Sequence, residues 1–130
     1  MNDTPSKKDI ISIVDDDEPL REALASLMKA AGFPTDTFAS AEEFLDSPIR
    51  RNAACLILDV RLPGMSGIEL QRCLLDDSNS LPIVFVTAHG DAALRDLAMK
   101  AGAAAFLNKP VRSETLLKEI HAAIEKSKAQ

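Results

Sequence analysis

The chain has 130 residues, of which 46% are hydrophobic and 27% charged, and its formal net charge is −5 at pH 7. This length and balance suit one globular domain whose core needs neither disulfides nor a structural metal. The acidic balance and the lack of basic clusters argue against nucleic-acid binding by this chain. The polar start and apolar stretches of at most about six residues exclude a signal sequence or membrane span, so we expect a cytoplasmic protein. Cys55 and Cys73 lack the spacing of a metal site, so we expect buried, reduced thiols.

The first predicted unit is a strand over residues 10–14, an acidic turn and a helix. The sequence DDDEP at residues 15–19 ends the apolar run abruptly. Apolar residues then recur at helical spacing until Gly32, which predicts an amphipathic helix. They are Leu20, Leu24, Leu27, Met28 and Ala31.

The next two units repeat this order. Strands are predicted over residues 34–38 and 54–58, and the second of them delivers Asp59 at its carboxyl end. A helix start follows each strand, because Ser and Glu stand three residues apart as in a capping box. The pairs are Ser40 with Glu43 and Ser66 with Glu69. The first helix carries Phe44, and the second should run to about residue 77.

Two further strands are predicted over residues 83–86 and 104–107. The first ends at Thr87, and the second is followed by a Lys-Pro pair at residues 109–110. Asp91 can cap the helix between these strands. The final helix has an apolar face made by Leu116, Leu117, Ile120, Ala123 and Ile124.

Five strands alternating with five helices predict an α/β domain, a doubly wound (βα)5 fold with one five-stranded parallel sheet. We expect this domain over residues 10–126, after a polar arm at 1–9 and before a polar tail or linker start at 127–130. In such sheets, sites form beyond the carboxyl ends of the strands. The residues at these ends are therefore the candidates for function.

The predicted strand ends carry three carboxylates, a hydroxyl and an ammonium group, from Asp15, Asp16, Asp59, Thr87 and Lys109. Adjacent carboxylates repel one another unless a cation lies among them, and oxygen donors without sulfur favour Mg²⁺. A carboxylate beside Mg²⁺ can attack phosphorus, and phosphoryl transfer needs neutralised phosphate oxygens. We therefore assign Asp59 as the nucleophile, with Lys109 and the Thr87 hydroxyl on two phosphate oxygens.

Each of these signals alone also fits an ordinary structural role. An acidic cluster after a strand commonly forms a solvated turn and helix cap. Threonine is frequent in strands, and a Lys-Pro pair often ends one. Their joint occurrence at four strand ends of one sheet edge is what favours a site.

Four segments together resemble the receiver domain of two-component response regulators, from Ile10 to about Lys126. They are IVDDDEPLRE, LILDVRLPGMSGIEL, VTAHGD and MKAGAAAFLNKP. The last two look like the branch that regulates transcription through a helix-turn-helix domain, of the nitrogen-fixation and nitrate-response type. The resemblance implies a flavodoxin-like strand order 2-1-3-4-5.

The resemblance also implies roles position by position. Asp59 matches the phosphoacceptor, which takes a phosphoryl group from a sensor histidine kinase. Asp16 matches the direct ligand of Mg²⁺, or of Mn²⁺ in its place, and Asp15 acts mainly through water. The backbone carbonyl of Arg61 completes the protein ligands. Lys109 matches the lysine that pairs with the phosphate.

On the output side, Thr87 matches the switch hydroxyl and Phe106 the aromatic residue that turns inward on activation. The family uses the last two helices and the fifth strand for homodimerisation or for docking an output domain or effector protein. The resemblance implies that Ala88, Arg61 and His89 occupy the positions that govern site access and phosphoryl lifetime in the family.

Two alternative functions fit the residues less well. A phosphatase resembling the haloacid dehalogenase group would need a second Asp two residues after the nucleophile, where this chain has Arg61. A receiver-like interaction domain that is never phosphorylated would be expected to lack Asp59 or Lys109, and both are present. We therefore expect a signalling module that catalyses its own phosphorylation and dephosphorylation. It is either a single-domain regulator or the receiver part of a longer transcription factor.

Overall fold

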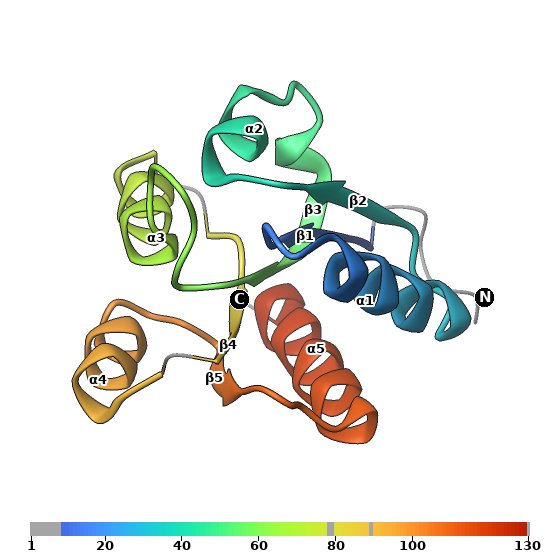
Figure 1. The fold of residues 1–130 in the computed structure, drawn as a ribbon. Coiled ribbons are helices and arrows are strands. Elements are labelled where there is room, and N and C mark those ends of the chain that lie inside the picture. The colour runs from blue at the N-terminus through green and yellow to red at the C-terminus, as the bar shows by residue number, and fades with distance from the viewer. Residues whose placement is uncertain (1–8, 78–79, 89, 130) are drawn as a thin grey trace.

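A computed structural model describes residues 9–77, 80–88 and 90–129 of the chain. In these residues five strands alternate with five helices, as predicted (Figure 1). The strands are β1 (Ile10–Val14), β2 (Thr35–Phe38), β3 (Ala53–Leu58), β4 (Ile83–Thr87) and β5 (Ala105–Asn108). The helices are α1 (Glu18–Ala30), α2 (Ala41–Asp46), α3 (Gly67–Asp76), α4 (Ala92–Lys100) and α5 (Ser113–Lys128). A short 3-10 turn, Arg50–Asn52, precedes β3.

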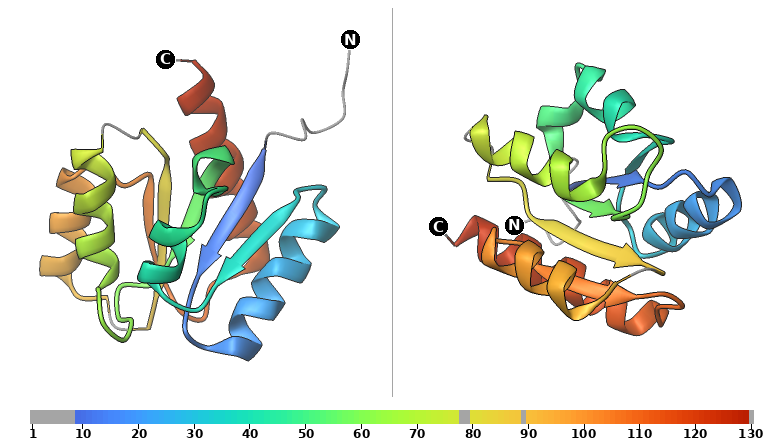
Figure 2. Two further views of the ribbon diagram at one scale, coloured as in Figure 1. Left: turned by 90° about the horizontal axis from the view of Figure 1, so that it is seen from above. Right: turned by 60° about the vertical axis from the view of Figure 1, so that its left-hand side comes forward.

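The strands form one sheet in the order β2-β1-β3-β4-β5, and every pairing is parallel. The doubly wound fold with strand order 2-1-3-4-5 is therefore confirmed. Helices α1 and α5 cover one face of the sheet, and α2, α3 and α4 cover the other (Figures 1 and 2). The order along the sheet reverses between β1 and β3, so the carboxyl ends of these two strands flank the crevice where such folds place their sites.

Side-chain caps fix where the helices begin. Asp17 accepts a hydrogen bond from Leu20 at the start of α1, and Asp91 accepts one from Leu94 at the start of α4. The capping box predicted at the start of α3 is present in full. At α2 it is incomplete, because the Glu43 carboxylate accepts from the Ala39 amide, one residue before the cap.

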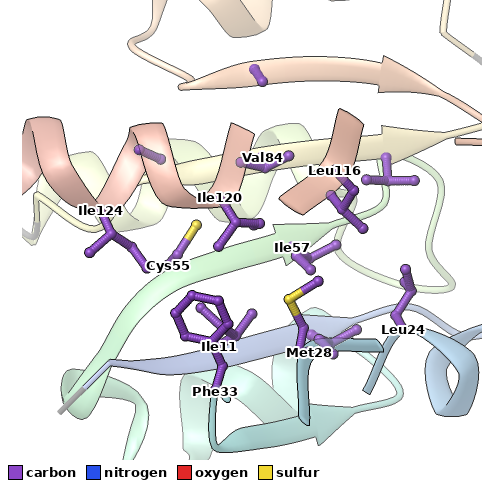
Figure 3. Close-up of a cluster of buried hydrophobic side chains, with 14 of the residues drawn as sticks. Ile11, Leu24, Met28, Phe33, Cys55, Ile57, Val84, Leu116, Ile120 and Ile124 are labelled. Carbon is purple, nitrogen blue, oxygen red and sulfur yellow. The ribbon is translucent and has the colours of Figure 1, made fainter. Parts of the chain in front are cut away.

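The apolar residues form two clusters, one on each face of the sheet. The cluster under α1 and α5 is built around Ile11, Ile57 and Ile120 (Figure 3). Cys55 belongs to it, and burial raises the pKa of its thiol to about 12, so this cysteine stays protonated and unreactive at neutral pH. Cys73 on α3 is only partly buried, so the expectation of a core position was right for Cys55 and wrong for Cys73.

The second cluster lies under α2, α3 and α4 and includes Phe44, Phe85 and Phe106. Helix α4 contributes little to it: within its described residues 92–100 only Ala98 is buried. Leu97 and Met99 of this helix are 47% and 38% exposed. Helix α4 is thus held to the sheet by a narrow contact.

The ends of the domain meet at the edge of the sheet opposite the carboxyl ends of the strands. Helix α5 continues to Lys128, two residues past the bound expected for the domain, and Lys128 Nζ lies 3.2 Å from Asp9 Oδ2. Asp9 directly precedes β1, so this ion pair joins the start of the sheet to the end of the last helix. Among the described residues, no helix is long and apolar enough to cross a membrane.

Candidate functional site

The parallel pairing brings the strand ends together as predicted. In the register of β1 and β3, Val14 lies opposite Leu58, so the two aspartates that follow these residues, Asp15 and Asp59, emerge side by side. The Asp59 amide donates to the Val14 carbonyl at 3.2 Å, which extends the strand pairing to the site itself. Lys109 follows β5, and its amide donates to the carbonyl of Thr87 at 2.9 Å.

One ammonium group bridges two of these carboxylates. Lys109 Nζ lies 2.9 Å from Asp59 Oδ2 and 3.1 Å from Asp15 Oδ2. Asp15 is 3% exposed and Asp59 is 6% exposed, so little water screens the attraction. Charge-assisted bonds of this kind are stronger than neutral ones, and they hold the three side chains in one arrangement.

The surroundings of the site raise the pKa of two of these groups, Asp15 and Lys109. Loss of hydration raises the pKa of Asp15, and the nearby charge of Asp59 adds to the increase, against the bonds from the Asp17 amide and Lys109. For Lys109, burial works to lower the pKa, but its bonds to Asp59 and Asp15 outweigh burial and raise it. The lysine therefore stays charged at neutral pH, while the Asp15 carboxylate carries a cost that a further cation would relieve.

Asp16 completes an acidic cluster at this edge. One carboxylate oxygen from each of Asp15, Asp16 and Asp59 lies within 4.8 Å of the others, and Asp16 is exposed to solvent. Three carboxylates and one ammonium leave a net charge of −2 (−3 + 1) on these four side chains. Their all-oxygen donor set and charge fit a hard divalent cation such as Mg²⁺.

The loop after Asp59 is folded back against it. The Arg61 amide donates to Asp59 Oδ1 at 3.2 Å, and the Arg61 side chain points into solvent. The Gly67 amide donates to the Val60 carbonyl at 2.8 Å, and a Cβ at Gly67 would overlap the Asp59 carbonyl oxygen. Glycine at position 67 therefore lets α3 begin directly against the backbone of Asp59. Sequence reasoning missed this residue, since nothing in the pattern SG before a helix reveals which backbone it approaches.

A second missed contact supports the acidic turn after β1. Arg21 on α1 donates from Nη1 to the Asp15 carbonyl oxygen at 2.7 Å. The Asp15 carboxylate also accepts from the Asp17 amide at 2.9 Å. The turn that carries Asp15 and Asp16 is thus held by a guanidinium group from the helix that follows it.

The predicted output residues lie on the neighbouring strands. Thr87 is fully buried at the end of β4, opposite Asn108 of β5. The Phe106 ring is buried and packs on Phe85, with ring centroids 5.7 Å apart. Ala88 is exposed, and His89 lies outside the described residues.

The sequence matches one known protein family over most of its length. Residues 11–121 match the family model of the response regulator receiver domain. The chain belongs to the response regulator receiver family.

Relatives and solved structures agree with this membership. Response regulator protein TodT of Pseudomonas putida is 45% identical over 116 residues, which cover 89% of this receiver and 51% of TodT. Transcriptional regulatory protein FixJ of Azorhizobium caulinodans is 36% identical over 120 residues, which cover 92% of this receiver and 57% of FixJ. A crystal structure of FixJ-N superposes with a TM-score of 0.80 at 38% identity and covers 96% of both chains. The receiver thus spans about half the length of the curated relatives it matches.

Proposed function

We propose that this receiver accepts a phosphoryl group on Asp59 from the phosphohistidine of a sensor histidine kinase. The observation that carries the proposal is the double contact of Lys109 Nζ with Asp59 Oδ2 and Asp15 Oδ2. The Asp59 carboxylate is thus buried at a strand end, beside the positive charge of Lys109 and the carboxylates of the acidic cluster. This arrangement is suited to phosphoryl transfer, which depends mainly on positioning and charge neutralisation.

In the proposed reaction, an Asp59 carboxylate oxygen attacks phosphorus and forms a P–O bond. The P–N bond to the kinase imidazole breaks, and the imidazole leaves with its electron pair and takes up a proton. Asp16, Asp59 and the Arg61 carbonyl would hold Mg²⁺ directly, with Asp15 acting through water, and the bound ion supplies positive charge to the phosphoryl oxygens. Lys109 pairs with one phosphoryl oxygen, and the Thr87 hydroxyl donates to another.

The acyl phosphate adds charge and acceptor oxygens at Asp59, and these favour movement of Thr87 and Lys109 toward them. Phe106 lies on β5 beside the strand that ends in Thr87, so it is placed to follow such a movement. Phosphorylation then shifts an equilibrium between two arrangements of this face. We propose that the shift controls homodimerisation through α4, β5 and α5 and regulates transcription through an output domain or partner.

Incubation with Mg²⁺ and acetyl phosphate tests the phosphoacceptor. We expect the wild-type protein to gain one phosphoryl group, Asp59→Asn to gain none, and the exposed-site control Asp96→Asn to behave as wild type. The chain contains no Trp, so intact mass or phosphate-affinity gels serve as the readout. Equal labelling of Asp59→Asn would exclude Asp59 as the acceptor.

A further inference from the structure

A glutamate outside the acidic cluster contacts the loop that follows Asp59. Glu42 lies in the first turn of α2, on the same face of the sheet as α3. Its Oε2 atom accepts a hydrogen bond from the Met65 amide at 2.8 Å. Glu42 and Met65 are 23 residues apart, so this bond joins two separate elements.

The backbone of the loop is shaped to this carboxylate. Gly64 has φ +75°, a left-handed conformation that favours glycine. A Cβ at Gly64 would lie 2.5 Å from Glu42 Oε2 and 3.3 Å from its Cδ. A residue with a side chain would be strained at this φ, and its Cβ would force the Glu42 carboxylate to shift, so Gly64 allows the close approach that lets the Met65 amide reach Glu42.

The two ends of the same loop are fixed by other bonds. The Arg61 amide is bound to Asp59 Oδ1 at 3.2 Å, and the Ser66 amide is bound to Glu69 Oε1 at 2.9 Å. Between them, residues 62–65 lie outside regular secondary structure. Glu42 thus holds the loop from outside at Met65, four residues after Arg61 and directly before Ser66. Loop positions of this kind tolerate displacement unless a contact constrains them.

We infer that Glu42 is a positioning residue for the reaction at Asp59. By holding the Met65 amide, its carboxylate keeps the loop in the conformation that presents the Arg61 carbonyl and the Asp59 carboxylate to a divalent cation. This inference rests on the proposed function for its chemistry. The hydrogen bond itself, however, can be tested without any phosphoryl transfer.

Two substitutions separate the hydrogen bond from the rest of the side chain. Glu42→Ala removes the acceptor, whereas Glu42→Gln keeps an oxygen that can accept from the Met65 amide. Glu43→Ala is the matched control, because Glu43 lies in the same turn and its carboxylate accepts instead from the nearby Ala39 amide. Thermal unfolding of each variant establishes that it is folded.

The first readout is the amide spectrum of the Mg²⁺-free protein. Loss of a charged acceptor should shift the Met65 amide proton upfield and perturb Gly64 and Arg61 in Glu42→Ala. The Met65 signal of Glu42→Gln should lie between those of Glu42→Ala and wild type, because a neutral acceptor remains, and Glu43→Ala should leave these signals unchanged. An unperturbed Met65 amide in Glu42→Ala would overturn the inference, whether or not Asp59 is phosphorylated.

The second readout is the affinity for Mg²⁺ alone, followed by the rate of labelling with acetyl phosphate. Loss of this hydrogen bond should weaken Mg²⁺ binding in Glu42→Ala by about three- to tenfold, with partial recovery in Glu42→Gln, which keeps an acceptor oxygen without the charge. The labelling rate should fall at subsaturating Mg²⁺ and return toward wild type at saturating Mg²⁺. Wild-type Mg²⁺ affinity in Glu42→Ala, or an equal loss in Glu43→Ala, would overturn the positioning role. A wild-type protein that binds Mg²⁺ but is never labelled would instead contradict the proposed function.

Discussion

Lys109 and Asp59 are 50 residues apart in the chain, yet Lys109 Nζ lies 2.9 Å from Asp59 Oδ2. The same nitrogen reaches Asp15, which is 94 residues away. One side chain therefore connects the ends of β1, β3 and β5. We expect both the stability of this sheet edge and its proposed chemistry to depend on that connection.

Replacing Lys109 should destabilise the Mg²⁺-free protein. Lys109→Ala leaves the buried carboxylates of Asp15 and Asp59 without their cation, so we expect the free energy of unfolding in urea to fall by about 2 kcal/mol. Mg²⁺ should bind to the variant at least as tightly as to wild type, because the competing ammonium is gone. Added Mg²⁺ should therefore narrow the difference in unfolding free energy between the two proteins. The exposed control Lys118→Ala should change neither quantity. Similar losses in both variants would show that the bridge contributes no stability.

The same pair of proteins gives a pH test. The pKa of Lys109 is raised above its ordinary value of 10.5 in the fold. The stability that Lys109 contributes is therefore fully present below pH 10.5 and is lost as the pH rises through the higher folded value. We expect the difference between wild type and Lys109→Ala to stay constant from about pH 7 to 9 and to shrink at higher pH. A difference that grows above pH 10.5 would contradict the assignment of the charge.

Asp15 should oppose folding when it is charged. Burial raises its pKa above the ordinary value of 3.8, so the folded protein favours the protonated carboxyl group. The stability that this proton contributes is fully present below pH 3.8 and is lost as the pH rises through the pKa of the folded state. Asp15→Asn should therefore raise the thermal midpoint of the Mg²⁺-free protein at neutral pH, with the gain fading toward about pH 4. Stabilisation by added Mg²⁺ should decrease in this variant. Asp17→Asn keeps the helix cap and serves as the control; equal behaviour of both variants would refute the specific role of Asp15.

Gly67→Ala should affect the reaction centre through the backbone. A Cβ at this position overlaps the Asp59 carbonyl oxygen, so the start of α3 or the end of β3 must shift. We expect a loss of about 1–3 kcal/mol in unfolding free energy and slower labelling by acetyl phosphate. Gly102→Ala is the comparison, because Gly102 has φ +101° and a Cβ there would meet nothing within 4 Å. It should cost about 1–2 kcal/mol from strain alone and leave labelling unchanged. Normal labelling of Gly67→Ala would refute the dependence of labelling on the contact between Gly67 and the Asp59 backbone.

Gly90→Ala should displace the Phe106 ring. A Cβ at Gly90 would lie 2.5 Å from Phe106 Cε1 and 2.6 Å from Asn108 Oδ1. We expect the Phe106 ring to leave its present position on Phe85, and the ring-proton shifts of these two residues to change. Nuclear Overhauser contacts between the rings measure this directly. Retention of the Phe85–Phe106 contacts in the variant would show that the Gly90 loop yields instead.

Much of the fold could be predicted because its signals are local. Unbroken apolar runs such as residues 54–58 indicate strands buried on both faces, and the carboxyl ends of parallel strands must share one edge. That rule was enough to group Asp15, Asp59 and Lys109. The strand order came from the resemblance to receivers, because the alternation of elements alone does not determine which strands are neighbours.

The supporting contacts could not be predicted for a physical reason. The hydrogen bonds between the Glu42 carboxylate and the Met65 amide, and between the Arg21 guanidinium and the Asp15 carbonyl, join side chains to backbone atoms of other segments. Such contacts leave no periodicity in the sequence. Helical spacing also failed to separate core from surface on α3, where Leu75 continues the apolar stripe but is 51% exposed.

The narrow attachment of α4 has a consequence for motion. A helix that buries one residue loses little apolar contact when it lifts from its neighbours, so its detachment is among the least costly excursions open to the native protein. We therefore expect motion in the microsecond to millisecond range to be concentrated in α4, which moves relative to a more rigid sheet.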